Sequence, residues 1–214
     1  MRSTTTRRAA LAAAALAAVT PLIGLSGCTT TRPSTMPMDH GGTTRAAAPT
    51  PSAAGTPAAG THNRADIMFA QMMIPHHQQA IEMSDLLLAK TDIDPEVSQL
   101  ARQIKAAQAP EITQMAGWLA GWGLPAMPST GHQMGGGMGG MMSPADLDAL
   151  ERATGTEAMQ LYLAGMITHH EGAIDMAEQQ LDDGENPDVK ELARRIITSQ
   201  RAEITTMREL LANL

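Results

Sequence analysis

The sequence predicts an all-α fold, an antiparallel four-helix bundle assembled from two copies of one helical hairpin. The first observation is a Met-Ile-x-His-His-x-x-Ala-Ile-x-Met motif that begins at Met73 and recurs 93 residues later. Two further motifs, Pro-x-Val-x-x-Leu-Ala-x-x-Ile from Pro95 and Gln-x-x-Glu-Ile-x-x-Met from Gln108, recur after 92 residues. The second observation is the helical period of the apolar residues within each copy. A repeat of this kind indicates a duplicated hairpin, and four long helices joined by short turns form a bundle.

The first 27 residues have the organisation of an export signal. Three arginines precede an apolar run over residues 9–19, which is too short to span a membrane as a mature helix. Leu-Ser-Gly then precedes Cys28, the only cysteine of the chain, as in a lipobox. We therefore expect residues 1–27 to be a lipoprotein signal peptide and Cys28 to carry the lipid that anchors the exported protein to the outer face of the cell membrane. Ordinary cleavage that leaves a free thiol, or an uncleaved anchor, is the alternative.

Residues 28–62 are rich in Thr, Pro, Ala and Gly and contain almost no large apolar residue. Such a segment cannot bury enough surface to fold, so it predicts a disordered tether that carries a folded domain at 63–214. The formal net charge of −7 becomes 12 − 22 = −10 when the three signal-peptide arginines are removed. An acidic protein without a basic stripe argues against a nucleic-acid partner. The sequence leaves the oligomeric state open.

Helix-capping residues place the first hairpin. Thr61 or Asn63 can cap the helix that carries the first His-His pair, and Asp94 followed by Pro95 predicts the start of the next helix. Pro75 lies inside the first helix, where a proline removes one backbone hydrogen bond and clashes with the preceding turn. We expect a local break beside the histidines.

The second hairpin has equivalent signals. Thr156 is expected to cap its first helix, and Gly184 followed by Asn186 is expected to separate its two helices. Between the hairpins, residues 123–142 form a loop rich in Gly and Met. Ser143, with a proline after it, then predicts a short helix.

Polar residues interrupt the apolar faces of the predicted helices. At about 100° per residue, His76 and His77 flank the centre of the inward face of their helix, and Gln108 and Glu111 lie in the apolar stripe of the next. Antiparallel pairing places Gln108 level with the two histidines and Glu111 about one turn away. The second hairpin repeats the arrangement with these residues: His169, His170, Gln200 and Glu203. Buried polar groups without partners are costly, so either one another or a metal must satisfy them.

Four inward histidines in duplicated pairs favour a metal site. A methionine lies three residues before each pair's first histidine and another seven residues after it, on the same side of the helix. The predicted ligands within the helices are His76, His77, His169, His170, Met73, Met83, Met166, Met176, Glu111 and Glu203. Thioether sulfur suits Cu(I), and imidazole suits copper in both oxidation states, so copper is the expected metal. Met115 and Met207 are expected to fill the core.

The glycine-rich loop carries a second set of soft donors. His132, Met134 and Met138 are spaced by glycines that would let them converge. Packing does not explain these residues, because the loop has no core to fill, and exposed methionine is easily oxidised. We expect them to bind metal as well, with low-complexity sequence as the alternative.

The duplicated motifs, which extend from about Asn63 to Leu214, resemble the family catalogued as domain of unknown function 305. The resemblance implies a ferritin-like four-helix bundle, often exported, with some members similar to copper-binding periplasmic proteins of metal resistance. It also implies metal binding by the His-His pairs and the paired methionines. One departure is Asp66, which aligns with Met159 in the second copy, so the two halves are not expected to bind metal identically.

We interpret the chain as a binding protein that sequesters or relays copper in the cell envelope, together with other copper-handling proteins there, rather than as an enzyme. A ferritin-like di-iron oxidase would carry Glu-x-x-His on its helices, and no Glu of the chain is followed three residues later by His. No Ser-His-Asp or Cys-His arrangement supports hydrolysis, and the glycine-rich stretch lacks the Lys of a phosphate-binding loop. The remaining alternative is a structural or protein-interaction bundle whose histidines are hydrogen-bonded internally.

Overall fold

The computed structural model describes residues 60–126 and 139–214, and every regular element within them is a helix. The five helices are α1 (Arg64–Leu88), α2 (Pro95–Gly121), α3 (Pro144–Arg152), α4 (Gly155–Asp183) and α5 (Pro187–Asn213). The predicted all-α helical bundle is confirmed. Each of these helices is too short or too polar to be a candidate for crossing a membrane.

Most helices begin at the residues that the sequence predicted. Asn63 opens α1 with a capping box, because its side chain accepts a hydrogen bond from the backbone N–H of Asp66 and its own N–H donates to the Asp66 carboxylate. Asp94 caps α2, Ser143 caps α3 and Asn186 caps α5, each through its side-chain oxygen. Pro75 lies within α1, and the helix continues through it as one element.

Helix α4 begins differently from the prediction that Thr156 caps it. Thr154 is the N-cap residue, and its side chain makes no capping hydrogen bond within the described part of the chain. Gly155 adopts a φ of 54°, a left-handed conformation that glycine takes without steric cost. The chain therefore turns into α4 through Gly155, and Thr156 already lies in the first turn.

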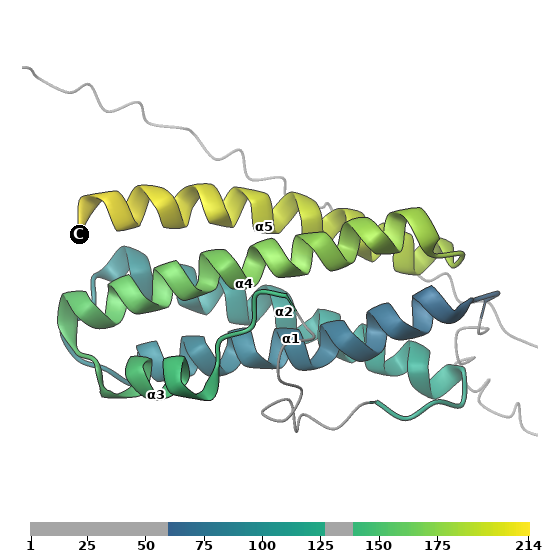
Figure 1. Ribbon diagram of the computed structural model, residues 1–214, viewed down its shortest axis with the longest axis horizontal. Coiled ribbons are helices and arrows are strands. Elements are labelled where there is room, and N and C mark those ends of the chain that lie inside the picture. Colours follow the sequence, from purple (N-terminus) through teal and green to yellow (C-terminus); the bar gives the residue numbers. More distant parts are fainter. Residues whose placement is uncertain (1–59, 127–138) are drawn as a thin grey trace, which may run out of the picture. The chain divides into compact units, whose positions relative to one another are not determined.

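The two hairpins pack through α1 and α4. Helix α2 lies along α1 and α5 lies along α4, whereas α2 and α5 touch at few positions (Figure 1). The Ser84 hydroxyl on α1 is 3.0 Å from the Tyr162 hydroxyl on α4, and Gln180 near the other end of α4 donates to Asp66 at the start of α1. Helices α1 and α4 are therefore antiparallel, and an approximate two-fold axis relates the hairpins.

Asp66 and Met159 hold equivalent positions in the two hairpins and close opposite turns. The buried Asp66 carboxylate accepts hydrogen bonds from the backbone N–H groups of Glu185 and Asn186, at 3.1 to 3.3 Å, in the turn between α4 and α5. Met159 Sδ accepts one from the N–H of Asp94, at 3.2 Å, in the turn between α1 and α2. The difference between Asp66 and Met159 in the repeat therefore changes the hydrogen bonds that stabilise each turn.

Candidate metal centre

Four buried histidines meet in the middle of the bundle. His76, His77, His169 and His170 are each 0% exposed. The rings of His76 and His169, which are equivalent residues of the two copies, lie 3.8 Å apart between centroids and are tilted by 39°. The approximate two-fold axis passes between these two rings, so α1 and α4 contribute equally to the layer.

Each hairpin pairs its second histidine with a glutamate. His77 Nε2–H donates to Glu111 Oε2 at 2.8 Å, and His170 Nε2–H donates to Glu203 Oε2 at 2.6 Å. The two glutamate side chains are each 19% exposed, whereas the histidine side chains are fully buried. The carboxylates therefore keep some hydration while fixing the rings.

The glutamines do not make these contacts. The sequence placed Gln108 level with the histidines and Glu111 one turn away, but Glu111 is the residue that reaches His77. The pairing of His77 with Glu111 is displaced along α2 by three residues, about one turn, from the register that the sequence suggested. Gln108 is 2% exposed, and neither polar atom of its side chain has a hydrogen-bond partner among the described residues.

Hydrogen-bond partners decide the tautomer of three histidines. His76 Nε2 lies 3.2 Å from the carbonyl oxygen of Gly139. Carbonyl and carboxylate oxygens only accept, so Nε2 carries the proton in His76, His77 and His170. In a neutral ring Nδ1 then bears the lone pair, and Nδ1 of all three lacks a partner among the described residues. Neither ring nitrogen of His169 has one.

Burial keeps the two central histidines neutral. Loss of solvation, followed by repulsion from His77, lowers the pKa of His76 to about 3. Loss of solvation, followed by repulsion from His76 and His170, lowers the pKa of His169 well below its ordinary value. Neutral imidazole is the form that binds a metal, so both rings are in that form at neutral pH.

The donor set fits copper. Five buried histidine nitrogens lack a partner among the described residues, and leaving a buried polar atom in that state costs about 1–3 kcal/mol. In the described part of the chain, no group of three or more His, Cys, Asp or Glu residues is placed to hold a metal ion. A metal here would therefore need side-chain movement or a donor of another kind, and thioether sulfur is the soft donor at hand.

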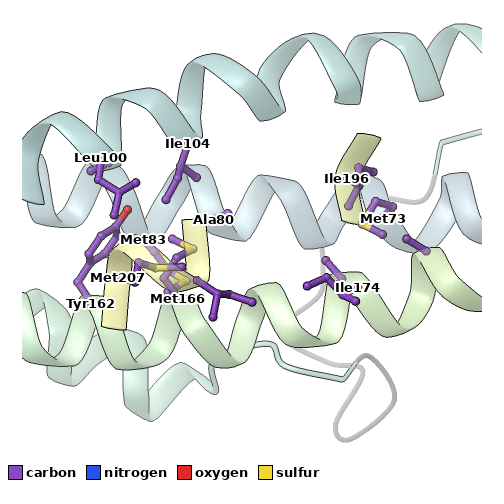
Figure 2. Packing of buried hydrophobic residues seen from close by; sticks show 14 of the residues in the cluster. Met73, Ala80, Met83, Leu100, Ile104, Tyr162, Met166, Ile174, Ile196 and Met207 are labelled. Atoms are coloured by element: carbon purple, nitrogen blue, oxygen red, sulfur yellow. The ribbon is translucent and has the colours of Figure 1, made fainter. Parts of the chain in front are cut away.

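Methionines lie on both sides of the histidine layer. Figure 2 shows Met83, Met166 and Met207 in the same region of the core as Tyr162. The register set by the pairing of His170 with Glu203 places Met166 opposite Met207. All three methionines are fully buried.

The repeat places an equivalent set on the other side of the layer. The pairing of His77 with Glu111 sets Met73 opposite Met115, and both are fully buried. Met176, the counterpart of Met83, is only half-buried. The predicted methionine ligands thus flank the histidines, and one of them reaches the surface.

Residues 139–142, the end of the predicted glycine- and methionine-rich loop and termed here the strap, lie over the layer, a contact that the sequence did not predict. Gln79 on α1 holds it, because the Gln79 side-chain amide donates to the Met142 carbonyl at 3.0 Å and Gln79 Oε1 accepts from the Met142 N–H at 2.8 Å. On α4, a Cβ at Gly172 would overlap the carbonyl oxygen of Gly139, so only glycine leaves room for the strap. Gln79 and Gly172 are equivalent positions of the repeat. The difference between these two residues is the sequence signal that could have indicated the contact with the strap.

Four predicted sites fall outside the described residues: Cys28, His132, Met134 and Met138. The predicted signal peptide and nearly all of the predicted tether fall outside them as well. These assignments stay predictions.

The family model for a domain of unknown function, DUF305, matches residues 66–211. A DUF305 fragment from Deinococcus radiodurans is 33% identical, with a TM-score of 0.65 over 71% of this chain and 98% of its own. A candidate secreted DUF305 protein from Streptomyces coelicolor is 40% identical, with a TM-score of 0.64 over 70% of this chain and 93% of its own.

A third similar structure is CopM in its Cu(II)-bound form, 36% identical with a TM-score of 0.61 over 69% of this chain and 96% of its own. CopM has also been solved in Cu(I)-bound, Ag-bound and apo forms. No curated protein sequence matches the chain. The match to the family model and the identities over more than two thirds of the chain show that this protein belongs to the DUF305 family.

Proposed function

We propose that this protein binds copper in the cell envelope, to sequester it or to relay it to other copper-handling proteins. The observation that carries the proposal is the layer of four fully buried histidines whose Nδ1 atoms lack partners among the described residues. Methionines flank that layer on both sides. Imidazole and thioether together suit Cu(I), and imidazole also suits Cu(II).

In this proposal the histidines bind through Nδ1, and the glutamates orient them. Glu111 and Glu203 accept the Nε2–H of His77 and His170, which leaves Nδ1 of each ring free to coordinate. A carboxylate behind a ligating histidine fixes its tautomer and raises its basicity. We therefore assign Glu111 and Glu203 as positioning residues rather than as direct ligands.

Relatives support the choice of metal. CopM, whose Cu(II)-bound structure is similar to this chain and 36% identical to it, has been solved with Cu(II), Cu(I) and Ag bound. Copper and silver are the soft metals that this chain's methionines and histidines also favour.

The N-terminal sequence supports export and anchoring. Leu-Ser-Gly before Cys28 predicts lipid attachment, and residues 28–62 predict a tether between the lipid and the bundle. Replacement Cys28→Ser should release the protein from the membrane fraction or leave its signal peptide uncleaved. Unchanged attachment of fully processed Cys28→Ser protein would contradict the lipid anchor.

A metal-independent structural bundle is the competing function. The two His–Glu hydrogen bonds favour it, because they satisfy one nitrogen of His77 and of His170 within the protein. The Nδ1 atoms of the four histidines and Nε2 of His169, which lack partners within residues 60–126 and 139–214, argue against it.

Metal analysis tests the proposal. Protein purified from cultures supplemented with copper, and separately with iron, should carry copper from the first and no iron from the second. Glu111→Gln with Glu203→Gln should weaken Cu(II) binding by about 10–100-fold without abolishing it, whereas replacing all four histidines should abolish it. Equal iron content, or Cu(II) affinity that is unchanged without the histidines, would overturn the proposal.

A further inference from the structure

A groove between α1 and α4 contains three methionines, two of which, Met68 and Met72, are not among the methionines that flank the histidine layer. The groove is a pocket of about 150 Å³, and its lining includes Met68, Met72, Met176, Phe69, Gln180 and Asp183. Met68 is 44% exposed, the most exposed of the large hydrophobic side chains in the described part of the chain. Met68 and Met72 are one turn apart on α1, so their side chains are neighbours on its surface.

Packing does not account for these thioethers. Core methionines fill irregular gaps, but Met68 is exposed and Met72 and Met176 are half-buried. The repeat offers a comparison, since Leu161 and Gly165 stand on α4 where Met68 and Met72 stand on α1. There the strap supplies the sulfur, because Met142 Sδ lies 2.8 Å from the position of a Cβ on Gly165. Met68 and Met72 therefore lie on a face of α1 that the strap does not cover, whereas the strap covers the equivalent face of α4.

A buried polar atom in the same lining also points to a bound cation. Gln180 is 2% exposed, and its Oε1 has no hydrogen-bond partner among the described residues. Its Nε2 donates to Asp66, which leaves Oε1 as the free acceptor of the amide. The Asp183 carboxylate lines the same pocket. Oxygen acceptors beside three thioethers favour a positively charged ligand that is also soft.

We infer that Met68, Met72 and Met176 form an outer site for a soft monovalent cation, Cu(I) or Ag(I), distinct from the histidine layer. Met176 connects the two regions, because it lies seven residues, about two helical turns, from His169 on α4. Copper as the natural ion rests on the proposed function, whereas soft-ion binding at the groove does not.

The test follows each methionine separately. The full mature chain, labelled with ¹³C at its methionine methyl groups, is titrated in the apo state with Ag(I), which is soft and stable to air. The methyl signals of Met68, Met72 and Met176 should shift together and saturate, and Zn(II) should leave them in place. Signals that stay in place with Ag(I), or that respond equally to Zn(II), would overturn the site.

Matched variants complete the test. Leucine conserves volume and removes the sulfur, so Met68→Leu, Met72→Leu and Met176→Leu together should weaken Ag(I) binding at this site by roughly tenfold or more. The control, Met115→Leu with Met207→Leu, changes buried methionines outside the groove and should leave the signals of Met68, Met72 and Met176 responsive to Ag(I). If the control variant no longer shows Ag(I)-dependent shifts of the Met68, Met72 and Met176 signals, the assignment of the site to these three residues is contradicted.

The variant that lacks all four histidines separates the two proposals. It should keep the Ag(I) response of Met68, Met72 and Met176, because no histidine lines the groove. If the groove gives no response while wild type binds Cu(II) through its histidines, the outer site alone is wrong. If the groove responds while the variant keeps full Cu(II) affinity, the proposed histidine site alone is wrong.

Discussion

The α1–α2 and α4–α5 hairpins repeat one motif, yet they contact the strap differently. On α1, Gln79 binds the strap through two hydrogen bonds. On α4, the equivalent residue is Gly172, and its lack of a side chain allows the strap backbone to approach the helix closely. His76 gains a carbonyl partner from the strap, and its counterpart His169 has none among the described residues. Duplication thus made the histidine layer symmetric, and the segment that joins the hairpins made its surroundings asymmetric.

The largest expected difference between the two hairpins is in how much a substitution at the residue that stabilises each turn lowers the free energy of unfolding. Asp66→Ala should destabilise the apo-protein by about 3 kcal/mol or more, because several buried donors lose their acceptor at about 1–3 kcal/mol each. Met159→Leu removes a single N–H···S contact at the equivalent position and should cost about 1 kcal/mol. Urea unfolding of both variants measures the ratio. Equal losses would show that the two turns are held equally.

Copper should stabilise both halves through one shared layer. Wild type at a free Cu(II) concentration one hundred times its Kd should gain about 2.7 kcal/mol, since a ligand that binds only the folded state stabilises it by mass action. The variant with His76, His77, His169 and His170 all changed to Gln should lose that gain in thermal melts. Changing either pair alone should reduce the gain to a similar extent.

The opposite pattern would support the structural bundle. In that case, wild type would be indifferent to copper, and the apo form of the fourfold variant would melt much lower. The orphaned carboxylates of Glu111 and Glu203 would be the physical cause.

The strap supplies the next prediction. Gly172→Ala should cost about 1–3 kcal/mol, because a Cβ there overlaps strap backbone that has little room to move. Gly117→Ala is the matched control on α2, where a Cβ meets nothing within 4 Å, and it should stabilise by about 0.5–1 kcal/mol. Hydrogen exchange at the Met142 N–H should speed up in Gly172→Ala alone. Unchanged exchange there would mean that the strap does not depend on Gly172.

The central histidines make the apo-protein sensitive to mild acid. In the folded state the pKa of His76 is lowered to about 3, and the pKa of His169 also lies well below the ordinary value of 6.5. As the pH falls, the unfolded chain therefore takes up protons before the folded protein does. The stability that depends on their neutrality is complete above pH 6.5 and is lost as the pH falls from there toward 3. Each histidine should remove about 1 kcal/mol over the first pH unit below 6.5.

The variant His76→Gln with His169→Gln should flatten that pH dependence. Urea unfolding at a series of pH values on either side of 6.5 measures it. A wild type that is equally stable across this series would contradict the neutral, buried state of the two rings.

The local features were accessible from the sequence because they depend on nearby residues. Asn63, Asp94 and Asn186 cap helices with their own side chains, and the period of apolar residues predicted which face of each helix is buried. The single failure among the caps, at Thr156, arose because the chain enters α4 through Gly155 in the left-handed region, which places the N-cap at Thr154, two residues earlier. The repeat also predicted that both His-His pairs face inward, which their complete burial confirms.

The sequence by itself therefore determined the helices, their duplication and the inward histidines, since all of these follow from spacing along the chain. Only the tertiary structure decided that His77 meets Glu111 rather than Gln108, because the register of α2 against α1 depends on how the turn between them packs. It also decided that the strap lies on His76 and Gln79 and that the groove beside Met68 stays open. The His77–Glu111 contact joins residues 34 positions apart and the strap contacts join residues 63 positions apart, and no local pattern encodes contacts at such separations.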